Sequence, residues 1–338
     1  MAAYTTIDNP ELYFQVKTYT GTGSSQAITL DGDKDMQPSM IWIKNRADST
    51  DHRIFDAVRE ASKSLIPNNT DAEYDDNTTV MLSSFNSDGF TVVSHSNVND
   101  SSDSHVAWCW KESADAGFDI VTYAGDGVEG RNISHSLSAV PHVMIVKNRT
   151  NAVKWAVYHH KNTAAPETDH LVLDTTAATS DDDSTWDDTA PGSSVFRVKG
   201  STSVNGNSAN YVAYLFSEKQ GFSKFGSYTG NGNADGAFVY TGMKISWLMV
   251  KKTNSASNNE WIIWDNKRST FNMVEKKLAA NLTNAETDAS WVGVDFLSNG
   301  FKFRSNDSIF NGSGDTYVYM AFAEAPFVNS NGVPCNAR

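Results

Sequence analysis

One short hydrophobic pattern occurs three times along the chain. It reads HVAWCWKE at residues 105–112, YVAYLFSE at 211–218 and YVYMAFAE at 317–324. Large apolar residues occupy alternate positions, which places them on one face of a β-strand, while small or varied residues occupy the other face. The apolar face is formed in turn by Val106, Trp108 and Trp110, by Val212, Tyr214 and Phe216, and by Val318, Met320 and Phe322. The pattern predicts three equivalent strands, each with a buried face.

Other landmarks recur around this strand in one fixed order. Each copy begins with an aromatic-to-glycine phrase: YTGTG at Tyr19, YAGDG at Tyr123 and YTGNG at Tyr228. An apolar strand that ends in a lysine follows, at Lys44, Lys147 and Lys251. The glutamates that close the copies, Glu112, Glu218 and Glu324, stand 106 residues apart. Self-similarity at a fixed period indicates an internal repeat, here of about 105 residues.

Each copy alternates short β-rich runs with clusters of Gly, Asn, Asp and Ser, which is typical of strands joined by tight turns. We therefore expect an all-β protein of three tandem antiparallel β-sandwich domains, of jelly-roll or lectin-like type. Only residues 55–66 and 272–282 suggest short helices. The expected boundaries are an N-terminal arm at 1–12, domains at 13–114, 115–220 and 221–327, and a C-terminal tail at 328–338.

The recurring aromatic and apolar side chains are the residues we expect to hold the fold together. The preferred arrangement gives each domain a separate core, and the alternative is one pseudo-threefold core that all three copies share. The connections at 113–116 and 219–220 are short, so the domains should pack side by side. The predicted core residues are Trp108, Trp110, Tyr214, Phe216, Met320 and Phe322.

Charge and composition exclude several classes of protein. The formal net charge is −13 and no basic stripe interrupts it, which disfavours nucleic-acid binding. The sequence has no secretory signal and no stretch long and apolar enough for a membrane helix, so we expect synthesis in a cytoplasm and no membrane insertion. Cys109 and Cys335 are the two cysteines; they make no disulfide scaffold, and Cys109 should be a small buried hydrophobe.

The side chains form no pattern that indicates a particular reaction. Eight histidines are present but none lies in the third copy, which excludes a histidine-dependent site repeated in every domain. The acidic runs at 31–35 and 181–183 lack EF-hand spacing and are interpreted as solvated loops. We expect each recurring glutamate to hold the first turn of the next domain, with the recurring lysines as candidate partners. No catalytic, cofactor-binding or metal-binding residue is predicted, and the protein is not expected to be an enzyme.

The combination YTGTG, IWIKNR, SDGFTV and VAWCWKE, repeated in tandem and closed by YMAFAEAPFVNSNGVPCNAR, resembles a family common in tailed bacteriophages, especially marine ones. The resemblance runs from about Tyr13 to the C-terminus. It implies a virion structural protein, a tail fibre or receptor-binding appendage, located in the virion and involved in host attachment. It supplies no catalytic residues. The chain lacks the collagen-like, coiled-coil or β-helical shaft of long fibres, so a capsid decoration or head-knob protein is an alternative, and a carbohydrate-binding module is another.

The terminal segments are too polar to form domains and are interpreted as assembly arms. Their apolar residues are the expected anchors on neighbouring subunits: Tyr4, Ile7, Phe327 and Val333. The expected partners are other virion proteins and a host surface glycan or receptor. For a fibre we expect a homotrimer, whereas three copies in one chain would let a monomer match a threefold site.

Overall fold

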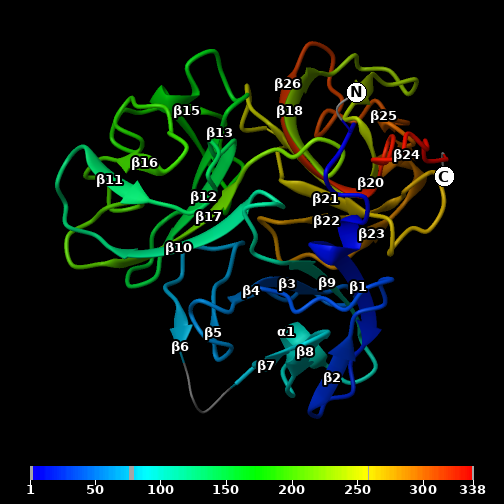
Figure 1. The fold of residues 1–338 in the computed structure, drawn as a ribbon, viewed down its shortest axis with the longest axis horizontal. Helices are drawn as coiled ribbons and strands as arrows, with labels where there is room; N and C mark the ends of the chain where they lie inside the picture. Colours follow the sequence, from blue (N-terminus) through cyan, green and yellow to red (C-terminus); the bar gives the residue numbers. More distant parts are fainter. Residues whose placement is uncertain (1–2, 76–79, 258, 337–338) are drawn as a thin grey trace.

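The computed structural model describes residues 3–75, 80–257 and 259–336, which consist almost entirely of antiparallel strands and turns. We call residues 13–114 unit 1, residues 115–220 unit 2 and residues 221–327 unit 3. Figure 1 shows the units as three lobes around a common centre. Each named strand pairs only with strands of its own unit, and every unit has one larger and at least one smaller sheet. The predicted all-β sandwich class is confirmed.

Unit 1 has a four-stranded large sheet in the order β1-β9-β3-β4 and a three-stranded small sheet in the order β2-β8-β7. A short pair, β5 and β6, continues the large sheet through a bridge between Ile54 and Leu65. The strands are β1 (Phe14–Thr20), β2 (Gln26–Thr29), β3 (Met40–Asn45), β4 (Arg53–Asp56), β5 (Lys63–Ser64), β6 (Tyr74–Asp75), β7 (Leu82–Asn86), β8 (Gly89–Val92) and β9 (Ser104–Trp110).

Unit 2 has a six-stranded sheet in the order β10-β17-β12-β13-β14-β15 and a small sheet of β11 and β16. Its strands are β10 (Phe118–Ala124), β11 (Arg131–Ser134), β12 (Val143–Asn148), β13 (Ala156–His159), β14 (Asp169–Val172), β15 (Ser180–Asp181), β16 (Val195–Val198) and β17 (Asn210–Phe216).

Unit 3 has a six-stranded sheet in the order β18-β26-β20-β21-β22-β23 and a small sheet in the order β19-β25-β24. Its strands are β18 (Ser223–Thr229), β19 (Phe238–Tyr240), β20 (Met243–Lys252), β21 (Ile262–Asp265), β22 (Lys276–Ala279), β23 (Thr287–Asp288), β24 (Val294–Leu297), β25 (Gly300–Phe303) and β26 (Thr316–Pro326).

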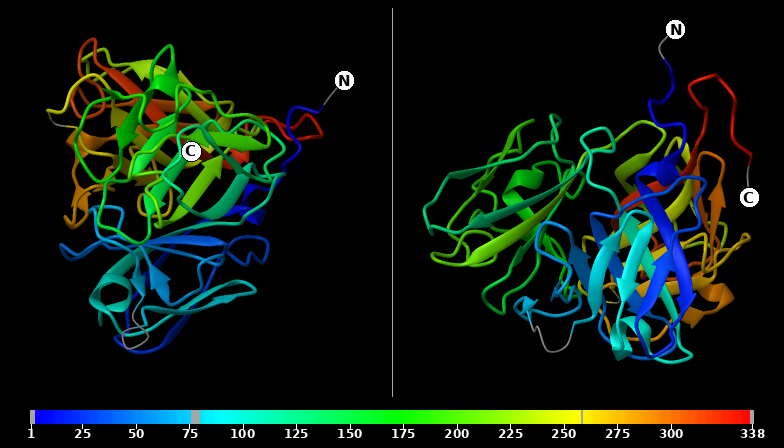
Figure 2. Two further views of the ribbon diagram at one scale, coloured as in Figure 1. Left: turned by 90° about the vertical axis from the view of Figure 1, so that its left-hand side faces the viewer. Right: turned by 60° about the horizontal axis from the view of Figure 1, so that its bottom comes forward.

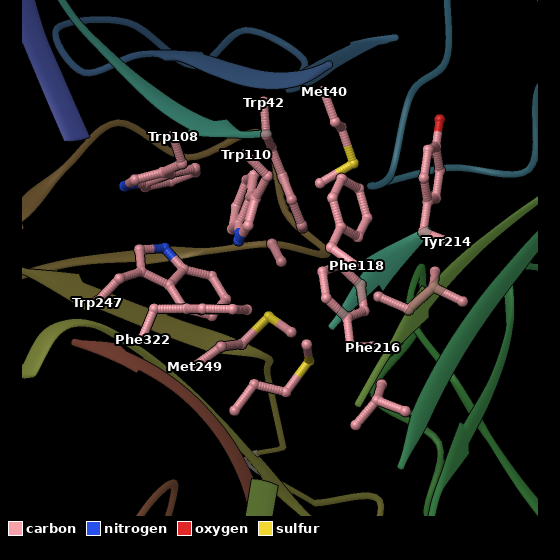
Figure 3. Packing of buried hydrophobic residues seen from close by; sticks show 14 of the residues in the cluster. Met40, Trp42, Trp108, Trp110, Phe118, Tyr214, Phe216, Trp247, Met249 and Phe322 are labelled. Atoms are coloured by element: carbon pink, nitrogen blue, oxygen red, sulfur yellow. The ribbon is translucent and has the colours of Figure 1, made fainter. Parts of the chain in front are cut away.

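The recurring aromatic face does not point into a core of its own unit. Trp108, Trp110, Tyr214, Phe216, Met320 and Phe322 all belong to one cluster that draws residues from the three units. Figure 3 shows the side chains of the five aromatic members of this set converging from different strands. Ring centroids of Trp110 and Phe322 lie 5.7 Å apart, and those of Phe216 and Phe322 lie 6.0 Å apart. The expectation of three separate aromatic cores is therefore wrong, and the alternative of a shared core describes the molecule.

The opposite face of each closing strand explains the error. Ala107 and Cys109 of β9 pack in a second cluster with the small sheet of unit 1, and units 2 and 3 have clusters of the same kind. Each large sheet is thus buried on both faces, between a unit core and the central core. Period-2 alternation shows which residues share a face of the strand, but not which of two buried faces points to the core of its own unit. Cys109 is buried, as predicted.

The centre of the molecule is packed. Its cavity has a volume of about 20 Å³ and is lined by apolar and aromatic side chains, among them Met40, Tyr214 and Met320. A void of that size holds about one water-sized probe, and an apolar void of this kind stays dry. The central core therefore serves cohesion and is not a ligand site.

The two helices expected at 55–66 and 272–282 are absent. Both stretches form turns and short strands, β4 and β5 in the first and β22 in the second. Pairing of Ile262 with Ala279 and of Ile263 with Leu278 extends the large sheet, and this long-range pairing outweighs local helix propensity. Residues 3–75, 80–257 and 259–336 contain one short α-helix, α1 (Ser96–Asn99), and three 3-10 turns, Pro10–Leu12, Pro166–Thr168 and Ser290–Val292. Among the described residues, none of the helices has the length and apolar character needed to cross a membrane.

The two terminal segments lie side by side against unit 3, as both views of Figure 2 show. Ile7 is buried in the central core, and the hydroxyl of Tyr4 donates to the carbonyl of Gly242 at 2.8 Å. The rings of Tyr4 and Phe327 meet edge to face with centroids 6.5 Å apart. Val333 is the one of the four expected anchors with a largely exposed side chain. Residues 1–2 and 337–338 of the expected arms lie outside the described residues. Binding of the arms to another subunit stays a prediction, and three of its four anchors already have contacts within the chain.

Candidate functional site

The three units are joined head to tail by one contact that occurs at each junction. A backbone N–H on a loop of one unit donates a hydrogen bond to a backbone carbonyl of the next unit. That carbonyl comes just after the strand with the recurring lysine, and the N–O distance is 2.9 Å each time. The last contact returns from unit 3 to unit 1, so the ring closes, as a head-to-tail interface does when its rotation permits. The three pairs are Glu73 to Arg149, Thr179 to Thr253, and Glu286 to Arg46.

The junction of units 1 and 2 contains a buried polar network. Asp56 at the end of β4 accepts hydrogen bonds from Arg59 Nε at 2.5 Å and from the Tyr214 hydroxyl of unit 2 at 2.7 Å. The side chains of Asp56 and Arg59 are fully buried. Glu73 accepts from Arg59 and, through both of its oxygens, from Arg149 at 2.8 Å. Burial alone would raise the pKa of Glu73, but the hydrogen bonds and charges of the two arginines outweigh it and lower the pKa.

The junction of units 3 and 1 repeats this network with equivalent residues. Asp265 accepts from Arg268 Nε at 2.5 Å and from the Trp108 indole of unit 1 at 2.9 Å. Glu286 accepts from Arg268 at 3.1 Å, from Arg46 Nε at 2.9 Å and from Arg46 Nη2 at 2.7 Å. Two of the three junctions are therefore held by the same arrangement, a fully buried Asp–Arg pair joined to a partly exposed Glu–Arg pair.

The junction of units 2 and 3 departs from that arrangement at five positions. The equivalent residues there are His159, Asn162, Thr179, Thr253 and Met320, which replace Asp, Arg, Glu, Arg and the Tyr or Trp. His159 accepts from the Lys161 N–H on Nδ1 and contacts the Tyr319 carbonyl through Nε2 at 3.1 Å, so Nε2 carries the proton. Burial lowers the pKa of His159 to about 3, which keeps the ring neutral.

Shorter side chains leave an open pocket at this junction. Its volume is about 320 Å³, and it lies where Asn162 and Thr253 stand in place of arginines. Asn162 Oδ1 accepts from the Thr179 hydroxyl at 2.7 Å, while its buried Nδ2 has no hydrogen-bond partner among the described residues. The lining residues are Lys161, Asn162, Ser227, Tyr228, Thr229, Thr253, Thr316 and Tyr317. We call this the junction pocket.

Strand periodicity places the hydroxyls in the junction pocket. Phe225, Ser227 and Thr229 lie on one face of β18, because alternate residues of a strand share a face. Phe225 packs in the central core, so the same face passes from apolar to polar as it leaves the centre. Across the strand pair, the hydroxyls of Thr316 and Thr253 hydrogen-bond each other at 2.7 Å. The pocket is therefore the polar end of the face that the three units bury.

The recurring glutamates behave as predicted at two of three positions. Glu112 Oε1 accepts from the Ile120 N–H and Glu218 Oε1 from the Phe225 N–H, so each holds the first strand of the following unit. Burial and the neighbouring Asp119 raise the pKa of Glu112 to about 7.

Glu218 and Glu324 have basic neighbours instead. Burial alone would raise the pKa of Glu218, but hydrogen bonds from His160, Lys224 and the Phe225 N–H outweigh it and lower the pKa to about 2. Glu324, in unit 3, pairs with Lys244 at 2.6 Å. These carboxylates therefore stabilise the fold.

The recurring lysines do not pair with those glutamates, so that expectation is wrong. Lys44, Lys147 and Lys251 have no exposed surface, and their ammonium groups donate to backbone carbonyls, for example Lys251 to Asn259 at 2.6 Å. Desolvation lowers their pKa to about 8, about 8 and about 7 respectively. The fixed position at the end of a buried strand, not an acidic partner, determines where each ammonium lies.

One acidic cluster was not singled out in the sequence. Ligand oxygens of Asp48, Asp100 and Asp103 lie within 4.8 Å of one another, with two of the residues exposed. Asp103 already accepts a hydrogen bond from Asn45 Nδ2 at 2.7 Å. Exposed acidic groups of this kind are common at loop ends, and this cluster carries no functional argument here.

Comparison with known proteins identifies the family. No curated protein and no solved structure is significantly similar to the chain. A family model described as a domain of unknown function, DUF7483, matches residues 9–326 as one continuous stretch, which covers the three units together. The chain therefore belongs to the DUF7483 family.

Proposed function

We propose that the protein is a non-enzymatic structural protein of a bacteriophage virion and that it serves as a tail-fibre or receptor-binding appendage in host attachment. The observation that carries this proposal is the junction pocket, an open, hydroxyl-lined site at the junction that lacks the buried ion pairs of the other two. A rigid ring with an open polar pocket at one junction suits recognition of a surface receptor. The resemblance to phage virion proteins supports the same function.

The recurring side chains support a structural function rather than a repeated reaction. The aromatic residues pack in the central core, and two of the recurring glutamates hold the strand that starts the next unit. Each of these contacts rigidifies the ring. A virion appendage needs this rigidity because it must keep its binding surface in one geometry outside the cell.

Electron microscopy of antibody-labelled particles tests the proposal. Gold label at the tail, together with inhibition of phage adsorption by the purified protein, is the expected result. Particles that carry the protein nowhere, or adsorption that is unaffected at saturating protein, would contradict it.

A capsid decoration protein is the second candidate, and the closed ring favours it. Three equivalent units around one centre would match a threefold site on a capsid as a monomer (Figure 1). Label on the head, with a copy number in the hundreds for each particle, would select this candidate over the tail appendage.

The partners proposed for the terminal arms are other virion proteins. Deletion of residues 1–12 also removes Ile7 from the central core, so loss of incorporation by that variant would have two explanations. Val333→Asp changes only an exposed side chain and is the sharper variant. Reduced incorporation into particles with an unchanged melting temperature supports the arm as an assembly contact, and normal incorporation opposes it.

A further inference from the structure

The junction pocket contains hydrogen-bonding groups that the rest of the chain does not use. Asn162 Nδ2 is a buried donor without a partner, and the hydroxyls of Ser227 and Thr229 make no side-chain hydrogen bond with another described residue. Buried polar groups in proteins are almost always paired, so an unpaired amide that lines an open pocket is a donor available to a ligand. The exposed Lys161 adds one cation to the lining.

These groups define the chemistry of a ligand. Hydroxyls both donate and accept, whereas the Asn162 amide nitrogen only donates. A complementary ligand therefore needs several closely spaced groups that both donate and accept, and at least one free acceptor. Apolar ligands would leave the lining unpaired, and a phosphate-rich ligand would find one cation. Adjacent hydroxyls on a sugar ring meet the requirement.

The two tyrosines of the lining pack in the core of unit 3. Tyr228 and Tyr317 are stacked with centroids 4.9 Å apart, and their hydroxyls already donate to the carbonyls of Phe310 and Ser308. Because Tyr317 has no exposed surface, these rings form the wall of the pocket and are not a contact surface for the ligand. A volume of about 320 Å³ is at the small end of the range for ligand pockets, so it suits about one or two sugar rings.

We propose that the junction pocket binds a terminal saccharide residue, with Asn162, Ser227 and Thr229 as the hydrogen-bonding residues. This inference rests on the proposed function in host attachment, because the saccharide would be the part of the receptor that the ring recognises. The five replacements at this junction then have one purpose: they exchange a buried ion-pair network for a binding site, while the backbone contact from Thr179 to Thr253 keeps the ring closed.

Ligand-observed NMR with the full chain tests the pocket. The probes are methyl glycosides of neutral hexoses, of N-acetylhexosamines and of uronic acids, and at least one class should give saturation-transfer signals. Thr229→Val should weaken that binding at least tenfold. Thr20→Val is the matched control, because Thr20 occupies the equivalent exposed position of β1 in unit 1, at an ion-paired junction.

A second variant fills the pocket without removing its hydroxyls from β18. Thr179→Glu combined with Thr253→Arg places the ion pair of the other junctions at this one, and binding should be lost. If this double variant does not fold, Thr229→Val and Ser227→Val still decide the question. Lack of binding by the wild-type chain to all three glycoside classes, or equal affinities of the Thr229→Val and Thr20→Val variants, overturns the inference. Tail labelling and adsorption inhibition would be unaffected by that outcome, so failure of the pocket and failure of the attachment function are distinguishable.

Discussion

The junction of units 1 and 2 and the junction of units 2 and 3 occupy equivalent places in the ring but are held by different chemistry. In the first, Asp56, Arg59 and Glu73 form a buried ionic network, and in the second His159 is neutral and makes hydrogen bonds to the backbone. Both keep the same backbone contact between units. The comparison teaches that the ring closes at the second junction without the ionic network, so that side chains there are free to form a pocket.

The largest effect is expected where a charge enters the centre of an ionic junction. Trp108→Asp puts a carboxylate into the central core next to Asp265, which now accepts from the Trp108 indole. Two buried like charges and a lost aromatic side chain should cost more than about 5 kcal/mol and prevent folding. Trp291→Asp, at a half-exposed tryptophan, is the control and should cost less than about 1 kcal/mol. Circular dichroism melting curves measure both, and a wild-type curve for Trp108→Asp would show that its position is wrong.

A pair of variants compares the two kinds of junction directly. Asp56→Ala leaves the fully buried Arg59 without its closest partner and should reduce the free energy of unfolding by about 3–5 kcal/mol. His159→Ala removes a neutral ring and its hydrogen bond to Tyr319, which should cost about 1–3 kcal/mol. Denaturant titration of both variants provides the measurement. Equal losses would mean that the ionic and neutral junctions do not differ in the way described.

The buried lysines predict a pH dependence that affects each unit. The folded-state pKa of Lys251 is about 7, whereas an unfolded lysine titrates near about 10.4. Between these values the unfolded chain binds more protons than the folded chain, so stability rises with pH, by at most about 1.4 kcal/mol per pH unit for one lysine. Below about pH 7 Lys251 is protonated in both the folded and the unfolded chain, so the free-energy cost of burying its charge no longer changes with pH. The free energy of unfolding of the wild type, minus that of Lys251→Met, should therefore increase from pH 7 to pH 9. A difference that does not change over this range would contradict the burial of a charged ammonium.

The smallest effect is expected from converting the third junction. Thr179→Glu with Thr253→Arg should restore the bidentate ion pair that Glu73 makes with Arg149, at a partly exposed site where such pairs contribute about 0–1 kcal/mol. The melting temperature should rise slightly or stay unchanged. A loss of more than about 2 kcal/mol would show that the junction pocket is not simply the space left by the missing ion pair.

Much of the fold could be predicted from the sequence because its strands repeat. The all-β class, the order of the copies and the glutamates at Glu112 and Glu218 followed from landmarks in fixed order. The direction of the Trp108 face could not be predicted, because both faces of β9 are buried and alternation does not distinguish a central core from a unit core. The helices expected at 55–66 and 272–282 failed because sheet pairing is non-local.

The candidate site was missed for a different reason. The landmarks that predict the fold are the positions that all three copies share, whereas the pocket lies at positions where the copies differ. The signal was present in the sequence: Arg59 and Arg268 have Asn162 as their counterpart, and Arg46 and Arg149 have Thr253. One arginine is missing from copy two, at Asn162, and another from copy three, at Thr253, but the proximity of these two positions across units is visible only once the ring is closed.

Differential scanning calorimetry of the full chain tests the central claim, which is that three units share one core and fold as one closed ring. We predict a single transition whose calorimetric and van't Hoff enthalpies agree, because the central core contains side chains from every unit. Separate transitions for the units, or an isolated fragment of residues 13–114 that melts as it does within the full chain, would contradict the shared core.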